Sequence, residues 1–184
     1  IAIAYKAGAK LENMEMVQFH PTTLKSSSTL ISESARGAGG KLVNSDGVRF
    51  TDELKARDEV SQDIKNQLDL GKDVFLDIRH LGEEFIDESI PQERKLCISY
   101  AGVDPVYDLI PITPAAHYSM GGIAVDENLM SSIDGLFAVG ECSNSKVHGA
   151  NRLGGNSLLE IVSFGRLVAS SALEYIKEVS DLKE

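Results

Sequence analysis

The chain has 184 residues, of which 42% are hydrophobic, enough for one well-packed core or for one domain with part of another. Acidic residues outnumber basic ones by 28 to 18, so the formal charge is −10 and nucleic acid is excluded as an expected partner. No apolar run approaches the roughly 20 residues of a membrane span. The two cysteines, Cys97 and Cys142, lack metal-ligand spacing, so we expect neither a disulfide framework nor a metal site.

The first part of the chain predicts a helix followed by a strand. Residues 1–12 have a helical period and read as the continuation of a helix, so we expect the chain to be an internal fragment, with any targeting segment upstream. Residues 14–20 predict a strand that breaks into a turn at Pro21, which puts His20 beside Thr22. A single histidine before a proline is more often structural than a ligand, so His20 alone decides nothing.

Residues 30–50 predict short strands and turns. Leu30 and Ile31 form a short strand, residues 37–40 a flexible turn, and residues 41–50 a β-hairpin. Glu33 and Arg36 are three positions apart, near enough for an ion pair. Most such pairs are solvated and contribute under about 1 kcal/mol, and that is the default interpretation here.

An amphipathic helix follows, with Arg57 at its beginning and Gly71 as its stop. An arginine is unfavourable at the positive end of a helix, which hints at a function, although an ion pair with Asp58 or Glu59 would also account for it. A strand at 74–78 and two short helices broken at Pro91 come next. Residues 103–114 contain three prolines and are predicted to cross between two domains in an extended conformation.

The last third of the chain carries the most distinctive stretch. His117 precedes a glycine pair and a strand, and residues 135–141 predict a buried strand ending at Glu141, where α/β sheets hold ribose or polyol hydroxyls. Residues 147–159 then lead through two glycines into a helix that Asn156 or Ser157 can cap, with a charged helical tail at 171–184. Helix-start amides favour negative charge, but a glycine loop before a buried helix is equally consistent.

Histidines and arginines recur at predicted loops and at the ends of predicted helices and strands, where catalytic and binding residues tend to lie. A small dicarboxylate is the natural partner of such a set, because guanidinium groups bind carboxylates through two parallel hydrogen bonds. Arg152 with His117 would hold one carboxylate. His20, with the hydroxyl of Thr22 or Ser32, would hold the other.

Six motifs in this order resemble the flavoprotein subunit of fumarate reductase and succinate dehydrogenase. The resemblance extends over nearly all of the chain, and the motifs are specific as a set rather than singly. They are QFHPT at 18–22, SESARGAGG at 32–40, RFTDELKARDEVS at 49–61, AAHYSMGGI at 115–123, GLFAVGE at 135–141 and HGANRLGGNSLLEIVSFGR at 148–166.

The resemblance implies an α+β fold, in which a Rossmann-like FAD-binding domain is interrupted by a small α+β capping domain. Residues 1–23 would belong to the FAD-binding domain, 24–112 to the cap, and 113–184 to the continuation of the FAD-binding domain and the start of a C-terminal helix. The family's G-x-G-x-x-G unit, its flavin-linked histidine and its C-terminal helical domain are not in this sequence. We therefore expect the fragment to be inactive, and unable to hold FAD, by itself.

The resemblance also implies an activity, the interconversion of fumarate and succinate by hydride transfer at flavin N5. Arg57 matches the family's proton donor, and Glu33 with Arg36 matches the relay that reprotonates it. An arginine suffices as acid because the accepting carbon gains carbanion character beside a carboxylate. The matching substrate-binding residues are His20, Thr22, Ser32 (more often threonine in the family), His117 and Arg152, and the cofactor-binding residues are Glu141, His148, Asn156, Ser157 and Leu158.

The implied partners are an iron–sulfur subunit and the membrane-anchor subunits of a respiratory complex. The protein would then serve anaerobic respiration from the cytoplasm, as a peripheral protein on the inner face of the membrane. Two alternatives stay open. L-Aspartate oxidase shares the His-Pro-Thr and His-Gly-Ala-Asn-Arg motifs, although Leu153-Gly154-Gly155 and SFGR favour the reductase; an inactive capping or interaction fragment is the other.

Overall fold

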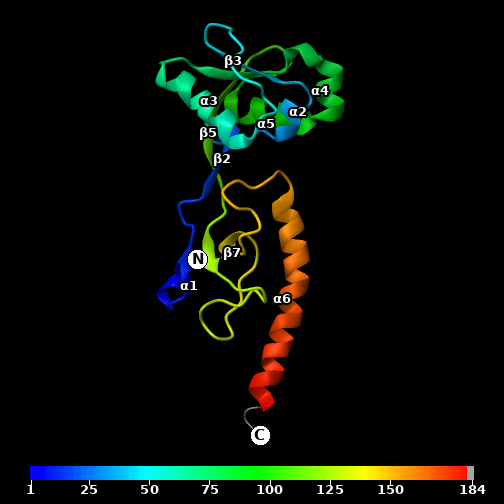
Figure 1. The fold of residues 1–184 in the computed structure, drawn as a ribbon. Coiled ribbons are helices and arrows are strands. Elements are labelled where there is room, and N and C mark those ends of the chain that lie inside the picture. The colour runs from blue at the N-terminus through cyan, green and yellow to red at the C-terminus, as the bar shows by residue number, and fades with distance from the viewer. Residues whose placement is uncertain (182–184) are drawn as a thin grey trace. The chain divides into compact units, whose positions relative to one another are not determined.

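The computed structural model describes residues 1–181, which form two compact units (Figure 1). The terminal unit comprises Ile1–Gln18 and His117–Glu184, and the insert unit comprises Phe19–Ala116. Each unit has its own apolar cluster, and helices and strands are mixed in both. The α+β class predicted from the sequence is confirmed.

The insert unit contains the larger core. Its sheet has the order β2-β5-β4-β3, and in the antiparallel register Leu42 lies opposite Leu76, which lies opposite Ile110. These three side chains are fully buried and pack with Ile64 of α3. Its elements are β2 (Val17–Leu24), α2 (Glu33–Gly37), β3 (Lys41–Asn44), α3 (Arg57–Asp69), β4 (Val74–Asp77), η1 (Arg79–Leu81), α4 (Glu83–Ser89), α5 (Pro91–Ala101) and β5 (Ile110–Ser119), with β2 and β5 continuing into the terminal unit.

The terminal unit has a small core around Ala9, Ile123 and Ala138. In its sheet, β6 pairs antiparallel with β1 and parallel with β7. The long helix α6, orange to red in Figure 1, contacts η2, and within residues 1–181 no helix meets the length and apolarity that crossing a membrane requires. The elements are α1 (Ala2–Lys6), β1 (Leu11–Glu12), β6 (Gly122–Ala124), η2 (Gly140–Cys142), β7 (Ser143–Asn144) and α6 (Asn156–Asp181).

Helix α6 is more exposed than the sequence predicted, since its apolar first half was interpreted as a buried helix. The sequence predicts Asn156 or Ser157 as the cap before this helix, whereas Asn156 is already its first residue. The tail helix continues the same element up to Asp181, and the end of the predicted tail, residues 182–184, lies outside the described residues. The interpretation as a buried helix is wrong for this chain. Large apolar side chains along it are exposed, among them Leu158, Leu159, Ile161, Val162, Leu167, Leu173 and Ile176.

Two N-terminal predictions need correction. The helix predicted over residues 1–12 ends at Lys6, because Gly8 adopts φ +97° and Leu11 enters a strand opposite Ile123. The strand predicted to break at Pro21 continues to Leu24. Since β2 lies at the edge of its sheet, a proline without an N–H is tolerated there.

Three further differences concern local elements. Helix α2 was not predicted, because five residues are too few for a clear helical period. The returning arm of the predicted hairpin makes an isolated bridge from Arg49 to Val43, while β3 pairs with β4 instead. The strand predicted at 135–141 is replaced by an isolated bridge at Phe137, because Gly135 (φ +75°) and Gly140 (φ +78°) interrupt an extended backbone. By contrast, the helix start at Arg57 and the break at Pro91 are confirmed.

Gly40 allows the closest packing in the insert unit. A Cβ atom at this position would lie 2.6 Å from the backbone oxygen of Ala35 and 2.9 Å from the Ile78 side chain. We expect Gly40→Ala to reduce the free energy of unfolding by about 1–3 kcal/mol, because the buried backbone has to shift. Gly37→Ala is the matched control, since nothing lies within 4 Å of its added Cβ. Urea unfolding of both variants tests this; equal stabilities would contradict it.

Candidate functional site

In the insert unit, His20 lies on β2 and is 1% exposed. The backbone N–H of Thr22 donates to His20 Nδ1 at 3.3 Å, which assigns the ring proton of a neutral imidazole to Nε2. The Thr22 hydroxyl donates to the carbonyl of Ile31 at 3.1 Å. Thr22 therefore helps to orient His20, and its own hydrogen is already engaged.

Ser32 has a local structural role as the cap of α2. Its Oγ accepts hydrogen bonds from the backbone N–H of Ser34 at 3.2 Å and from the Ser34 hydroxyl at 2.8 Å. A serine hydroxyl accepts two hydrogen bonds and donates one, so the Ser32 hydrogen can still be offered to an anion. The cap also fixes the first turn of α2, from which Glu33 and Arg36 project.

Arg57, Glu33 and Arg36 form one chain of charges. Arg57 Nε donates to Glu33 Oε2 at 3.2 Å, and Arg57 Nη2 donates to the same oxygen. The other carboxylate oxygen lies 3.9 Å from Arg36 Nη2. Arg36 is 2% exposed whereas the Glu33 side chain is 48% exposed, so the interpretation as a solvated surface pair is wrong for Arg36 and holds only for Glu33.

The environment of Arg36 is unusual for a guanidinium group. Its Nη1 donates to the backbone oxygen of Glu53 at 2.6 Å, whereas Nε and Nη2 are buried without a hydrogen-bond partner among the described residues. Burial lowers the pKa of Arg36 from its usual value, and Glu33 opposes this only in part. Arg36 is thus a buried cation whose Nη2 lies near the Glu33 carboxylate but beyond hydrogen-bonding distance of it.

The Glu33 carboxyl gives a prediction for pH dependence. Hydrogen bonding from Arg57, followed by the charges of Arg57 and Arg36, holds the pKa of Glu33 below its usual value despite partial burial. The pair therefore stabilises the fold above the pKa of an unfolded glutamate, and this is lost as the pH falls through the lower folded pKa. In an NMR titration of the side-chain carboxyl carbons, we expect Arg57→Ala to raise the Glu33 midpoint. An unmoved midpoint would contradict the pairing.

In the terminal unit, Arg152 is held by a set of polar and aromatic contacts. The residue is 4% exposed, its Nη2 lies 3.2 Å from His117 Nε2, and its Nη1 donates to the Leu153 carbonyl at 3.2 Å. The guanidinium carbon lies 4.4 Å from the ring centroid of Tyr118, a cation–π contact. Arg152 and His117 are thus brought together as predicted.

Gln18 fixes the backbone that carries Arg152, and the sequence reasoning did not assign it a role. Its Nε2 donates to the Arg152 carbonyl at 2.6 Å and to Asn151 Oδ1 at 2.7 Å, and the residue is 4% exposed. A glutamine two positions before His20 on the same strand was the available signal. Its position alone gave no indication of a partner more than 130 residues away.

A pocket of about 410 Å³ opens beside Arg152. Glu141, an acceptor for hydroxyl groups, contributes a carboxylate that also accepts the Ser119 N–H at 3.0 Å. Two of the helix-start amides predicted to bind flavin already donate hydrogen bonds within the chain. The backbone N–H of Asn156 donates to the Leu153 carbonyl, and that of Leu158 donates to the Gly155 carbonyl. The pocket is lined by His117, Tyr118, Glu141, Arg152, Ser157, Leu158 and Ile161, a combination of cationic, hydroxyl-binding and apolar groups that fits a flavin beside a carboxylate ligand.

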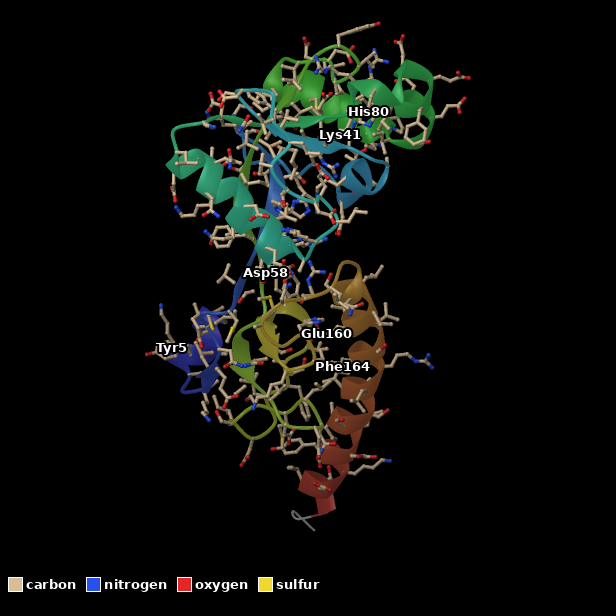
Figure 2. All side chains as sticks on the ribbon, turned by 45° about the horizontal axis from the view of Figure 1, so that its top comes forward. Tyr5, Lys41, Asp58, His80, Glu160 and Phe164 are labelled. Atoms are coloured by element: carbon tan, nitrogen blue, oxygen red, sulfur yellow. The ribbon has the colours of Figure 1, made fainter. Side chains whose placement is uncertain are left out.

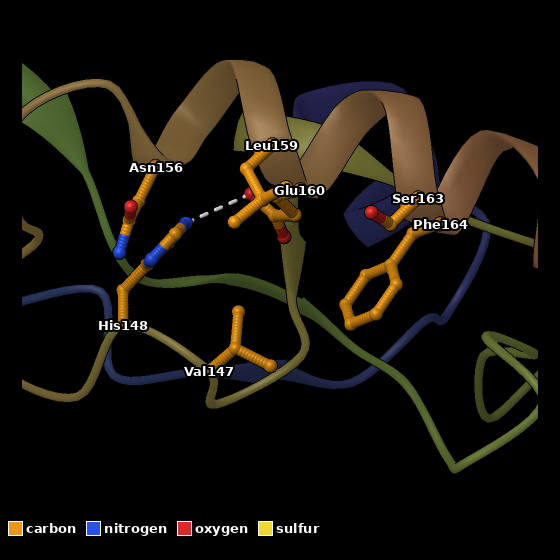
Figure 3. A pocket seen from close by; sticks show the side chains of 7 residues that line it. All are labelled: Val147, His148, Asn156, Leu159, Glu160, Ser163 and Phe164. Carbon is orange, nitrogen blue, oxygen red and sulfur yellow. Dashed lines mark hydrogen bonds and ion pairs between the residues drawn. The ribbon is translucent and has the colours of Figure 1, made fainter.

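The other two predicted cofactor residues, His148 and Asn156, line a different cavity of about 240 Å³ (Figure 3). There His148 Nε2 lies 2.9 Å from Oε2 of Glu160, a carboxylate on α6 (Figures 2 and 3). Sequence reasoning missed Glu160, although a single carboxylate within the apolar stretch at 158–162 was a signal. The predicted site residues thus fall into an insert-unit group and a terminal-unit group, and their convergence on one ligand stays a prediction.

Comparison with known proteins decides the family. A model of the FAD binding domain family matches residues 1–158, which is most of the chain. The chain belongs to this FAD binding domain family. FAD is the cofactor of such domains.

Two curated relatives and one solved structure show how this family member compares with others. The Escherichia coli fumarate reductase flavoprotein subunit is 44% identical over 95% of this chain and 33% of its own length, and the Pyrococcus abyssi L-aspartate oxidase is 49% identical over 90% and 35%. The structure of E. coli quinol fumarate reductase superposes with a TM-score of 0.89 at 43% identity, covering 94% of this chain and 34% of that one. The chain thus spans about a third of the length of these relatives.

Proposed function

We propose that the protein carrying this chain interconverts fumarate and succinate with FAD. The arrangement Arg57–Glu33–Arg36 is the observation that carries the proposal, because a paired arginine backed by a carboxylate and a buried second arginine suits proton delivery. The 44% identity to a fumarate reductase flavoprotein subunit supports the same reaction.

Arg152 and His117 would bind one carboxylate of the substrate. The Arg152 side chain is prearranged by its contacts with Tyr118 and His117, so little conformational freedom is lost when an anion binds. His20 and Ser32 would bind the other carboxylate through Nε2–H and Oγ–H. Negative charge grows on that carboxylate during hydride transfer, so these fixed donors would stabilise the transition state.

Arg57 would donate the proton to the carbon that does not receive hydride. Arg36 then passes a proton to Glu33, which passes one on to Arg57, and Arg36 regains its proton from solvent water, which restores the starting state. The lowered pKa of Arg36 favours its part in this exchange, because burial makes its cationic form easier to deprotonate. FAD, when bound, would supply hydride transfer at N5. We propose that Glu141, Ser157 and Leu158 of the pocket beside Arg152 hold it, together with His148 and Asn156 of the other cavity.

The two units correspond to proposed domains. We assign the insert unit to a capping domain and the terminal unit to the FAD-binding domain, with boundaries near residues 23 and 113. An iron–sulfur subunit and membrane-anchor subunits are the proposed partners, in line with a structural relative that is a quinol fumarate reductase. This would place the protein on the inner face of the cell membrane.

L-Aspartate oxidase is the second candidate, favoured by a specific feature of the alignments. The 200 aligned positions of the E. coli relative cover 95% of the chain, about 175 residues, so about 25 positions have no residue here. The 167 positions of the P. abyssi oxidase cover 90%, about 166 residues, almost without gaps. Both reactions use a four-carbon dicarboxylate, so the Arg152 site serves either proposal.

A substrate comparison tests the proposal. The full-length protein that carries this chain, loaded with FAD, is assayed for fumarate reduction with a reduced dye and for oxidation of succinate and of L-aspartate with an oxidised dye. We expect turnover of fumarate or succinate and none of aspartate. Aspartate oxidation without succinate oxidation would replace the reductase by the oxidase. No turnover of any of the three would favour the inactive capping fragment.

A further inference from the structure

A buried carboxylate, Glu160, accepts three hydrogen bonds next to the Arg152 pocket. Its side chain is 3% exposed. Ser145 Oγ donates to Oε1 at 3.0 Å, Tyr118 Oη donates to Oε2 at 3.2 Å, and His148 Nε2 lies 2.9 Å from Oε2. A carboxylate only accepts, so this arrangement places a proton on His148 Nε2.

Tyr118 connects this carboxylate to the substrate side of the unit. One end of its side chain, the hydroxyl, binds Glu160, while the face of its ring lies 4.4 Å from the guanidinium carbon of Arg152. The edge of the ring also meets the His148 ring, with centroids 5.8 Å apart at 85°. Tyr118 is 7% exposed, and burial, followed by the Glu160 charge, raises its pKa to about 12. It therefore stays a hydrogen-bond donor over the physiological pH range.

We infer that Glu160 is a positioning residue for the dicarboxylate site: it fixes Tyr118 by a hydrogen bond, and the Tyr118 ring fixes the Arg152 guanidinium. Glu160 does not line the pocket beside Arg152 and so acts through Tyr118. The inference rests on the proposed function for the role of Arg152 as a carboxylate ligand. The arrangement of the three side chains can be tested without it.

A glutamine at position 160 would hold Tyr118 less firmly than Glu160 does. Its carbonyl oxygen can accept from Tyr118 and His148 while its NH₂ group donates to the Ser145 hydroxyl, which can also accept, but the amide is neutral. Hydrogen bonds to a charged acceptor are roughly twice as strong as those between neutral groups, so the Tyr118 bond, the longest of the three, would be weakened first. The Arg152 guanidinium would then lose the aromatic face that it lies on.

The test uses the FAD-loaded protein with Glu160→Gln and Tyr118→Phe, together with Glu174→Gln as the control, the same change at an exposed position of α6. Two quantities are measured: the dissociation constant of malonate, a non-reacting dicarboxylate, from the flavin absorbance, and the position of the Arg152 guanidinium in crystal structures. We expect both test variants to weaken malonate binding about tenfold. The double variant should be no weaker than the singles, because both act on one hydrogen bond.

The outcomes separate the inference from the proposed function. If the unaltered protein binds no dicarboxylate, the proposed function fails, and the crystal structures still decide whether Glu160→Gln moves Arg152 off the Tyr118 ring. An unmoved guanidinium in Glu160→Gln, or malonate affinities equal to that of Glu174→Gln, would overturn the inference. Should Glu160→Gln fail to fold, Tyr118→Phe decides alone, since it removes the same hydrogen bond and keeps the ring.

Discussion

Replacing Arg57 by alanine in the FAD-loaded protein should slow fumarate reduction by about 100- to 10,000-fold, the contribution typical of a positioned acid. The dissociation constant of malonate should change little, because the proposed carboxylate ligands, Arg152, His117, His20 and Ser32, are all retained. The reduction rate with a dye as electron donor and the malonate titration measure the two quantities separately.

The control for this substitution is Arg79→Ala. Arg79 lies in the same unit and also pairs with a carboxylate, Asp77 at 2.9 Å, but it stands in η1 and is not among the predicted site residues. Its removal should leave the rate unchanged. Turnover of the Arg57→Ala protein within a few-fold of the original would remove Arg57 from the role of acid, and the Arg57–Glu33–Arg36 arrangement would then be an ordinary ion-pair network.

Arg152→Lys should raise the dissociation constant of malonate by about 10- to 100-fold. A lysine keeps the positive charge but loses the planar fork that binds both carboxylate oxygens, and it cannot keep the guanidinium's contacts with Tyr118 and His117 together. Because fumarate, succinate and aspartate all present carboxylates, this expectation holds for the reductase and for the oxidase.

Arg166→Lys, an exposed arginine on α6, is the matched control and should leave the affinity unchanged. The rate at saturating substrate should fall less than the affinity in Arg152→Lys if this residue mainly binds the ground state. An Arg152→Lys protein with unaltered malonate affinity would mean that the Arg152 pocket is not the dicarboxylate site.

The sequence predicted well those elements whose signals are local. The start of α3 at Arg57, strand β4 and the break at Pro91 follow from periodicity and from the chemistry of proline within a few residues. The sequence-based prediction was wrong where a distant segment determines the local structure. Leu11 lies in a strand because it pairs with Ile123, and Pro21 is tolerated within β2 because β2 is the edge strand of its sheet.

The same division applies to the candidate site. The sequence by itself determined which residue types are present and their family motifs, so Arg57, Glu33 and Arg152 could be named before any coordinates. Only the tertiary structure decided that Arg36 is buried and that Glu160 accepts a hydrogen bond from Tyr118, which lies 42 positions away in the sequence. It also decided that the Tyr118 ring centroid lies 4.4 Å from the Arg152 guanidinium carbon. Burial and long-range hydrogen bonds depend on how separate segments pack, and a linear pattern of residue types does not contain that information.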